Sequence, residues 1–372
     1  MILRRKYLRK FYMMRSDFEQ TLIPLLYSAL HHGHAPSVEY LHGKTIPYAE
    51  QPQRIENIRS ALEKSGLVNL EECGDSVPKS AILKAHDAGM VEFLETASDR
   101  LNQVMHSDAA AYRPSPDQNY LYPSVFPVRS SMNRLRENAR GPHGFYFFDT
   151  EAPIGRETWK AASGAASLAY AGAELILSGQ THVAYALCRP PGHHAGIDFM
   201  GGYCYVNNAA IAAHHLRAAG KVALIDIDYH HGNGTQSIFW EVPDVLFISL
   251  HADPDTDYPY YSGYADETGP HGTIINKPLP PGTGETDYLA AFDEVTPSIR
   301  AFEPRSVVVS LGFDTYQDDP LGTFQLTANT YHKIARRVAA FKLPTLLIQE
   351  GGYAVESLGK LAVSFLSGFI VP

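Results

Sequence analysis

The stretch KVALIDIDYHHGNGTQ (221–236) indicates the fold of this sequence. Its first seven residues, 221–227, form a short apolar run rich in β-branched residues, and both faces of the run are apolar, as in a buried parallel strand. The run ends in a cluster of Asp, His, Gly and Asn residues. In open parallel α/β sheets, ligands bind just beyond the carboxyl ends of the strands. The stretch therefore predicts a buried strand that delivers polar side chains to a binding edge.

Further apolar runs of the same kind alternate with long, Ala-rich amphipathic segments. Strands are expected at 182–188, 245–250, 306–311 and 344–349, and helices at 158–177, 207–219, 287–302 and 327–341. Two of the helices are followed by glycines that favour helix termination, Gly179 and Gly220. This alternation is typical of βα units around a parallel sheet. We expect a single α/β domain whose central, mainly parallel sheet has helices on both faces.

Two segments of the 372-residue chain lack this alternation. Residues 1–20 are basic and aromatic, without the apolar stretch of a secretory signal, and we expect a flexible extension there. Residues 21–372 then form the folded domain. Within it, 107–151 is rich in proline and aromatic residues, and we interpret it as a long loop insertion of the kind that is usually functional.

Composition excludes several classes of protein. Apolar residues make up 45% and charged residues 19%, as in a globular enzyme. No stretch approaches the ~18 uninterrupted apolar residues of a membrane span. A net charge of −9 disfavours nucleic-acid binding; it would attract a cationic substrate, although ordinary acidic solubility explains it equally well. The three cysteines show no CxxC spacing, which favours a reducing, cytoplasmic setting.

Asp228 and His230 follow the strand of 221–227 and lie two residues apart, so in extended geometry their side chains leave on the same face. Asp314 follows the strand of 306–311 and completes a set of three. Any one of these residues alone would often only cap a helix. Together, three ligands of N and O type leave a fourth position for water, which is the arrangement of a catalytic zinc.

The pair His193-His194 follows a stiff Pro-Pro-Gly turn after the strand of 182–188. Two imidazoles beside an activated water can take its proton and pass one to a leaving amine. By contrast, His31-His32 in a Gly-flanked loop and His214-His215 within a helix are expected to be solvated. Tyr353 follows Gly-Gly after the strand of 344–349 and could donate its hydroxyl to an oxyanion, although alone it would more often be a packing residue.

These residues lie in a set of motifs that resembles the zinc-dependent histone deacetylase family, with the greatest similarity to bacterial acetylpolyamine amidohydrolases. The resemblance runs from about Leu25 to near the C-terminus. The motifs occur in one order: RPPGHHAG (189–196), GGYCYVNNAA (201–210), DIDYHHGNGTQ (226–236), SLGFDT (310–315) and EGGY (350–353).

The resemblance implies an arginase/deacetylase fold and a zinc-dependent removal of acyl groups from N-acylated amines. It implies that zinc and the tyrosine polarise the acyl carbonyl while an activated water attacks. The implied positions are zinc on Asp228, His230 and Asp314, His194 as general base and then acid with Asn233 as its partner, His193 as electrostatic helper held by Asp226, and Tyr353 as oxyanion donor.

The family also implies potassium sites and substrate contacts. One potassium site would lie near Asp226, Asp228, His230, Ser249 and Leu250, and a second near Phe239, Val242 and Val245. Substrate contacts would come from Gly202, Tyr203, Tyr258 and Glu151. In the polyamine enzymes the segment matching 107–151 forms a homodimer contact and narrows the entrance, where Glu151 would meet a cationic tail. Arg140 occupies a second, normally acidic position, and a cation there would repel a polyamine.

Three other functions are compatible with parts of this pattern. A lysine deacylase acting on proteins or peptides would use the same chemistry with a more open entrance. A ureohydrolase such as an arginase shares the fold, but the aspartate pattern for two manganese ions is lacking. A catalytically silent acyl-amine binding protein would not require the complete set of catalytic and ligand residues.

Overall fold

A computed structural model describes residues 22–41, 43–105, 117, 119–126 and 144–370. Its centre is an eight-stranded sheet in the order β10-β9-β8-β11-β12-β7-β1-β4, in which every neighbouring pair is parallel. The strands are β1 (Ile23–Tyr27), β4 (Val68–Glu72), β7 (Val183–Ala186), β8 (Val222–Asp226), β9 (Val245–Ala252), β10 (Ile274–Leu279), β11 (Ser306–Leu311) and β12 (Thr345–Gln349). The α/β fold and the five predicted strands are confirmed.

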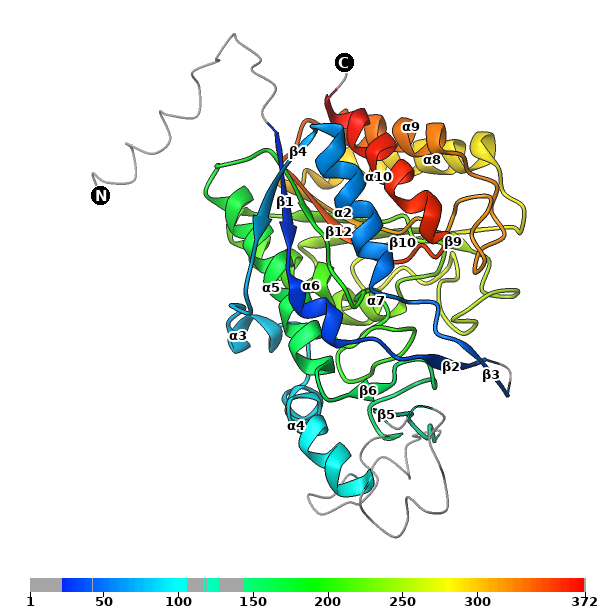
Figure 1. Ribbon diagram of the computed structural model, residues 1–372. Coiled ribbons are helices and arrows are strands. Elements are labelled where there is room, and N and C mark those ends of the chain that lie inside the picture. Colours follow the sequence, from blue (N-terminus) through cyan, green and yellow to red (C-terminus); the bar gives the residue numbers. More distant parts are fainter. Residues whose placement is uncertain (1–21, 42, 106–116, 118, 127–143, 371–372) are drawn as a thin grey trace.

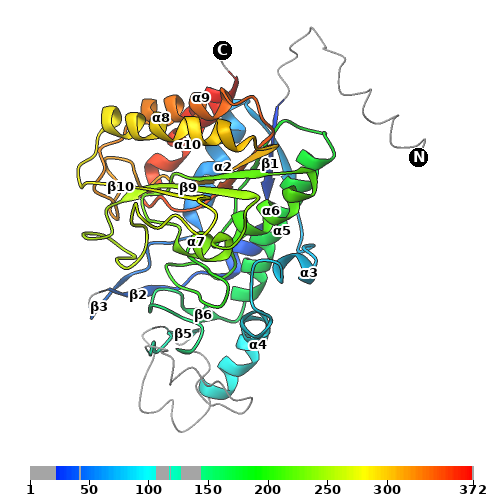
Figure 2. The same cartoon turned by 180° about the vertical axis from the view of Figure 1, so that it is seen from behind.

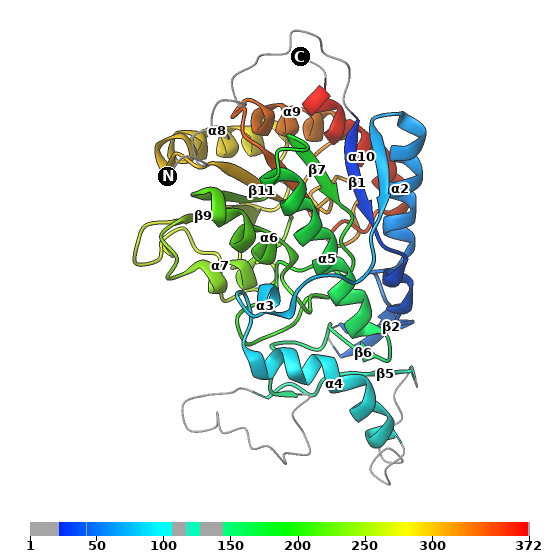
Figure 3. The same cartoon turned by 90° about the vertical axis from the view of Figure 1, so that its left-hand side faces the viewer.

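Helices cover both faces of the sheet, as Figures 1 and 3 show. One face has α2 (Gln53–Ser65), α8 (Glu285–Phe302), α9 (Ala328–Ala339) and α10 (Val355–Ile370). The other has α5 (Thr158–Leu177), α6 (Asn208–Leu216) and α7 (Asn233–Phe239), with α3 (Lys79–Ile82) and α4 (Ala88–Met105) packed beyond them. Among the described residues, one large hydrophobic core therefore lies on each side of the sheet.

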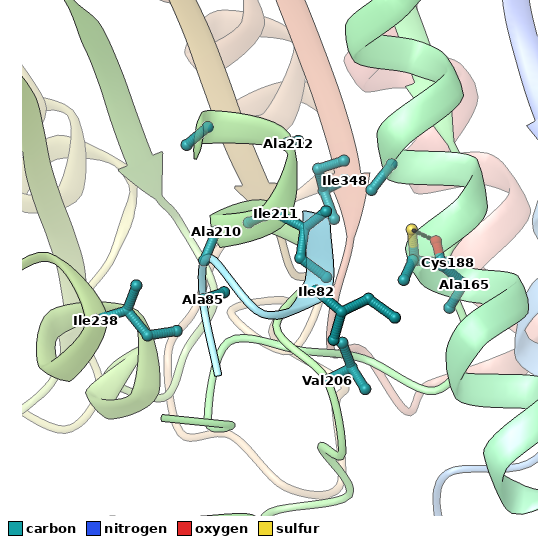
Figure 4. Close-up of a cluster of buried hydrophobic side chains, with 14 of the residues drawn as sticks. Ile82, Ala85, Ala165, Cys188, Val206, Ala210, Ile211, Ala212, Ile238 and Ile348 are labelled. Carbon is teal, nitrogen blue, oxygen red and sulfur yellow. Dashed lines mark hydrogen bonds between the residues drawn. The ribbon is translucent and has the colours of Figure 1, made fainter. Parts of the chain in front are cut away.

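Small residues bring α5 close to the sheet. A Cβ placed on Gly172 would lie 2.5 Å from Cδ1 of Leu346 in β12, so a larger residue would push the helix away. Figure 4 shows the core on this face, where Ile211 of α6, Ile82 of α3 and Ile348 of β12 gather. The Cys188 thiol there donates to the Ala165 carbonyl at 3.3 Å, within hydrogen-bonding range for sulfur.

Shorter elements lie beside the carboxyl ends of the strands, below the sheet in Figures 1 and 2. They are η2 (Ala29–Gly33), the hairpin of β2 (Val38–Leu41) and β3 (Lys44–Pro47), and the paired β5 (Tyr120–Leu121) and β6 (Ile154–Gly155); η5 (Arg217–Ala219) extends α6. Residues 1–20, Arg140 and most of the predicted 107–151 loop lie outside the described residues. Among those that are described, no helix is long and apolar enough to cross a bilayer.

The expectation of solvated histidine pairs is wrong for His31, which is only 3% exposed. It lies in η2 rather than in an open loop, and the side chains of Tyr27 and Glu56 pack against its ring. His214 is also half-buried, against the Phe239 ring of α7. Local sequence gave no sign of these contacts because the covering residues come from other elements.

Candidate active site

Three predicted metal ligands converge at the carboxyl ends of β8 and β11, which are neighbours in the sheet. Their ligand atoms, from Asp228, His230 and Asp314, all lie within 4.8 Å of one another. Nδ1 of His230 is 3.4 Å from Oδ1 of Asp228 and 3.2 Å from Oδ2 of Asp314. Both carboxylates are fully buried, whereas the His230 side chain is 15% exposed. One side of the group therefore faces solvent.

Two glycines leave room for these carboxylates. A Cβ on Gly312 would lie 2.2 Å from Oδ2 of Asp228, and a Cβ on Gly351 would lie 2.3 Å from Oδ2 of Asp314. The Gly351 N–H also donates to Oδ2 of Asp228 at 2.8 Å. Any side chain at either position would displace a ligand carboxylate.

The charge of this group fits a zinc ion. Burial and the neighbouring Asp228 carboxylate raise the pKa of Asp314 to about 7, because two buried negative charges side by side repel each other. A divalent cation between them would relieve this repulsion. Two carboxylates and one imidazole are also ligands that zinc accepts in open, catalytic sites. Asp228, His230 and Asp314 are therefore suited to hold the ion.

The two histidines of the pair lie beside this group with their ring centroids 4.0 Å apart. Nδ1 of His193 is 3.1 Å from Oδ2 of Asp226, and Nδ1 of His194 is 2.7 Å from Oδ1 of Asn233. Burial lowers the pKa of His194 well below its usual range. Burial also acts to lower the pKa of His193, but the Asp228 and Asp226 carboxylates outweigh it and raise that pKa to about 10. His194 is thus the neutral member of the pair.

A buried glutamate holds the histidine loop in place. Oε2 of Glu350, just beyond β12, accepts the backbone N–H groups of Gly192 at 2.7 Å and His193 at 3.2 Å. Ser310 of β11 donates to its other oxygen. Sequence reasoning missed this contact because the partners lie 157 and 158 residues apart.

Arg54 of α2 packs against the ring of Tyr353 and binds the backbone beside it. The guanidinium carbon lies 4.7 Å from the centroid of the tyrosine ring, and Nε donates to the carbonyl of Gly352 at 2.5 Å. The Tyr353 N–H donates to Oδ2 of Asp319 at 2.6 Å, and Gly352 has a φ of +112°, which disfavours other residues. Burial raises the pKa of Tyr353 well above its usual range, so its hydroxyl keeps the proton that an oxyanion donor requires.

Arg54 belongs to a buried ion cluster that sequence reasoning also missed. Oε1 of Glu50 accepts from Arg54 at 2.5 Å and from Arg189 at 2.9 Å, and all three side chains are fully buried. Arg189 precedes the histidine pair and Arg54 contacts the backbone before Tyr353. Glu50 therefore connects the two loops that carry the acid–base and oxyanion groups.

The predicted substrate-contact residues lie around the histidine pair. The Tyr258 ring stands edge-on to His194 with centroids 5.0 Å apart, and Gly202 has no space for a Cβ, which would lie 2.5 Å from Cδ2 of His194. Oδ2 of Asp149 accepts hydrogen bonds from the Tyr258 hydroxyl at 2.6 Å and from the Gly202 N–H at 2.7 Å, and so fixes both residues. This role of Asp149 was not predicted from the sequence. The ring of Tyr203 lies 5.7 Å from that of Tyr353.

Glu151 is a largely buried carboxyl group close to these residues, with the carboxyls of Asp149 and Glu39 nearby. Burial, followed by the charges of Asp149 and Glu39, raises its pKa to about 8. Glu39 is itself 2% exposed and hydrogen-bonded by Tyr203. A cation bound beside these carboxyl groups would favour the ionised form of Glu151.

The predicted potassium positions form two groups. In the first, Asp226 and Ser249 are register partners across β8 and β9, and both are fully buried. In the second, Phe239 ends α7, and its carbonyl accepts the N–H of Val242 at 3.0 Å just before Val245 starts β9. The first group offers a carboxylate and a hydroxyl oxygen of the kind hard cations bind. The second group would offer main-chain oxygens. Potassium at either group remains a prediction.

The sequence matches a known protein family. The histone deacetylase domain family matches residues 48–369. The chain belongs to the histone deacetylase family. As a family member it is a deacetylase, that is, a hydrolase of amide bonds. The predicted resemblance is confirmed.

Several relatives of this deacetylase cover nearly its whole length. "Acetylpolyamine amidohydrolase 1" of Pseudomonas aeruginosa is 41% identical over 361 residues, which are 92% of this chain and 98% of the relative. The acetylpolyamine amidohydrolase of Mycoplana ramosa is 40% identical and covers the same shares. The crystal structure of an acetylpolyamine aminohydrolase from Burkholderia pseudomallei superposes with a TM-score of 0.84 at 34% identity, covering 93% of this chain and 98% of that one.

Proposed function

We propose that this deacetylase removes the acetyl group from small N-acetylated polyamines or diamines, with one zinc ion bound by Asp228, His230 and Asp314. The observation that carries the substrate class is the position of Glu151 beside Asp149, whose carboxylate holds the predicted substrate contacts Gly202 and Tyr258, because Glu151 could there bind the cationic amine at the far end of such a molecule. Relatives named acetylpolyamine amidohydrolase support the same class.

When bound, zinc would polarise the acyl carbonyl and acidify water. The remaining chemistry belongs to the side chains. Because Nδ1–H of His194 donates to Asn233, its Nε2 has a free lone pair and accepts a proton from the attacking water. His194 then delivers that proton to the leaving amine nitrogen. His193, which retains its proton beside Asp226, stabilises negative charge near it, and the Tyr353 hydroxyl donates to the developing oxyanion.

The test is a turnover panel of acetylputrescine, acetylcadaverine, acetylspermidine and an acetyl-lysine peptide. The proposal expects kcat/KM to be highest for the small acetylated amines and to be lost on chelation and restored by zinc. Turnover of the peptide at a comparable kcat/KM would contradict the substrate assignment and favour the lysine deacylase. Activity indifferent to chelators would contradict the zinc assignment.

We also propose one catalytic domain over 21–372, potassium at the two predicted groups, a homodimer through 107–151 and a cytoplasmic location. The eight-stranded sheet combines β1 and β4 from the first part of the chain with strands up to β12, which supports the single domain. Phe126, one of the described residues of that loop, is 62% exposed, as an interface residue would be before association. The free Cys73, Cys188 and Cys204 suit a reducing compartment. Light scattering measures the molar mass of the wild type and of Phe126→Ser in solution. A wild type with the mass of a monomer contradicts the proposed homodimer.

A further inference from the structure

A second group of metal-ligand side chains lies where η2 meets α2. Ligand atoms of His31, His32 and Glu56 all lie within 4.8 Å of one another. Within the part of the chain that the structure describes, this and the active-site group are the two sets with that property. We propose that His31, His32 and Glu56 form a second metal site, which binds a divalent transition-metal ion such as zinc.

The spacing of the donor atoms fits one ion. Oε1 of Glu56 lies 3.0 Å from Nε2 of His31 and 3.3 Å from Nε2 of His32. Ligands bound at ~2.0–2.1 Å to a tetrahedral zinc stand roughly 3.3 Å apart. The two imidazole rings lie alongside each other, with centroids 4.1 Å apart and planes inclined by 31°, so both Nε2 atoms reach the same carboxylate oxygen.

Three polar atoms lie close to Oε1 of Glu56. It accepts the Tyr27 hydroxyl at 2.8 Å and lies 3.0 Å from Nε2 of His31 and 3.3 Å from Nε2 of His32. Nε2 of His32 is also 3.4 Å from the Tyr27 hydroxyl oxygen. Both imidazole nitrogens therefore lie beside the same carboxylate oxygen, where each could present a lone pair to a cation.

Neighbouring groups orient the glutamate. Arg59 binds its other oxygen, Oε2, at 2.7 Å and lies over the Tyr27 ring, which leaves Oε1 directed at the histidines. Such contacts to the second oxygen are how proteins fix a ligating carboxylate. His32 is 51% exposed, so an ion can enter from solvent and water can complete its coordination. Two imidazoles and one carboxylate favour zinc, nickel or copper over magnesium or calcium.

The site would join η2 to α2 within the catalytic domain. The His31 carbonyl accepts from Arg189 at 2.6 Å, and Arg189 binds Glu50. An ion that links η2 to α2 would bind the folded chain and not the unfolded one, and would therefore stabilise the fold as its concentration rises. Its role is structural and adds no group to the reaction.

The test counts metal in the full-length protein after dialysis against a fixed low concentration of free zinc. Wild type is expected to retain one zinc ion per chain more than His32→Ala or Glu56→Gln. The matched control is His215→Ala, which removes another half-buried histidine with a carboxylate partner, Glu174, and should retain the wild-type number. Because the readout is a difference between variants, it does not depend on the occupancy of the active site.

Thermal melting provides a second measurement. Added zinc is expected to raise the Tm of wild type and His215→Ala by more than that of His32→Ala. His32 is half exposed, so His32→Ala should fold, and circular dichroism checks this. Equal zinc content in folded wild type and His32→Ala would overturn the proposal, and so would an equal loss in His32→Ala and His215→Ala.

Discussion

Replacing Glu151 with Gln should weaken substrate binding and stabilise the fold, with both effects growing as the pH rises. The wild-type pKa of about 8 means that roughly 3% of Glu151 is ionised at pH 6.5 and about 90% at pH 9. A substrate ammonium keeps its charge until about pH 10. We therefore expect the wild-type KM for acetylputrescine to fall through this range, while that of Glu151→Gln stays nearly constant.

The size of the effect on KM follows from the charge that is lost. A hydrogen bond to a charged group contributes about 1.5–3 kcal/mol, which corresponds to a ratio of KM values of roughly 10- to 150-fold at pH 9. The assay is steady-state kinetics at several pH values. The matched substrate is N-butylacetamide, which has the same acyl group and chain length but no ammonium, and its KM should be insensitive to Glu151→Gln.

Glu151→Gln should weaken substrate binding but increase the free energy of unfolding. Burial and neighbouring carboxylates raise the pKa of Glu151 from 4.5 to about 8, so the folded state binds more protons than the unfolded state between these values. The free energy of unfolding falls as the pH rises through that window. At ~1.4 kcal/mol per pKa unit, Glu151→Gln should recover a few kcal/mol at pH 9 in urea unfolding. A KM ratio that does not change with pH, or a loss of stability at pH 9, would refute the reasoning.

Three further predictions concern the active site. Tyr353→Phe should keep zinc and ligand binding but lose about 2–4 kcal/mol of transition-state stabilisation, measured as kcat; near-normal turnover contradicts the oxyanion role. Asp314→Ala should lose one zinc ion per chain and activity together, since one of three ligands is removed; metal analysis that finds the full wild-type zinc content argues against the assignment. Gly351→Ala should also lose zinc and activity although no ligand is removed, because its Cβ would lie 2.3 Å from Asp314 Oδ2. Ala354→Gly is the nearby control and should keep both.

The sequence predicted much of the sheet because buried parallel strands have apolar runs with no polar interruption. Strands β4 and β10 escaped prediction since they are the sheet edges and contain polar residues or proline, as in VNLEE and IINKPL. Strand β1 was missed too, and it begins with Ile-Pro. The polar residues at the strand ends were predictable because their spacing follows directly from strand geometry.

The residues that orient the site could not be predicted in the same way. Arg54 contacts Gly352 across 298 positions, and Glu50 contacts Arg189 across 139. Such pairs leave no local periodicity or motif, since each residue alone is an ordinary charged side chain. Asp149 and Glu350 are similar cases, and the burial of His31 was missed because its covering residue, Glu56, lies on a separate helix.

The order of strands in the sheet has a consequence for the chain during its synthesis. The central strands β8, β11, β12 and β7 are not consecutive along the chain, and β12, which leads to Tyr353, is made last but lies between β7 and β11. A nascent chain that ends before residue 345 contains the histidine pair and the metal ligands but leaves the middle of its sheet open. Catalysis therefore waits until β12 and Tyr353 have been synthesised, and products truncated before residue 345 should be inactive.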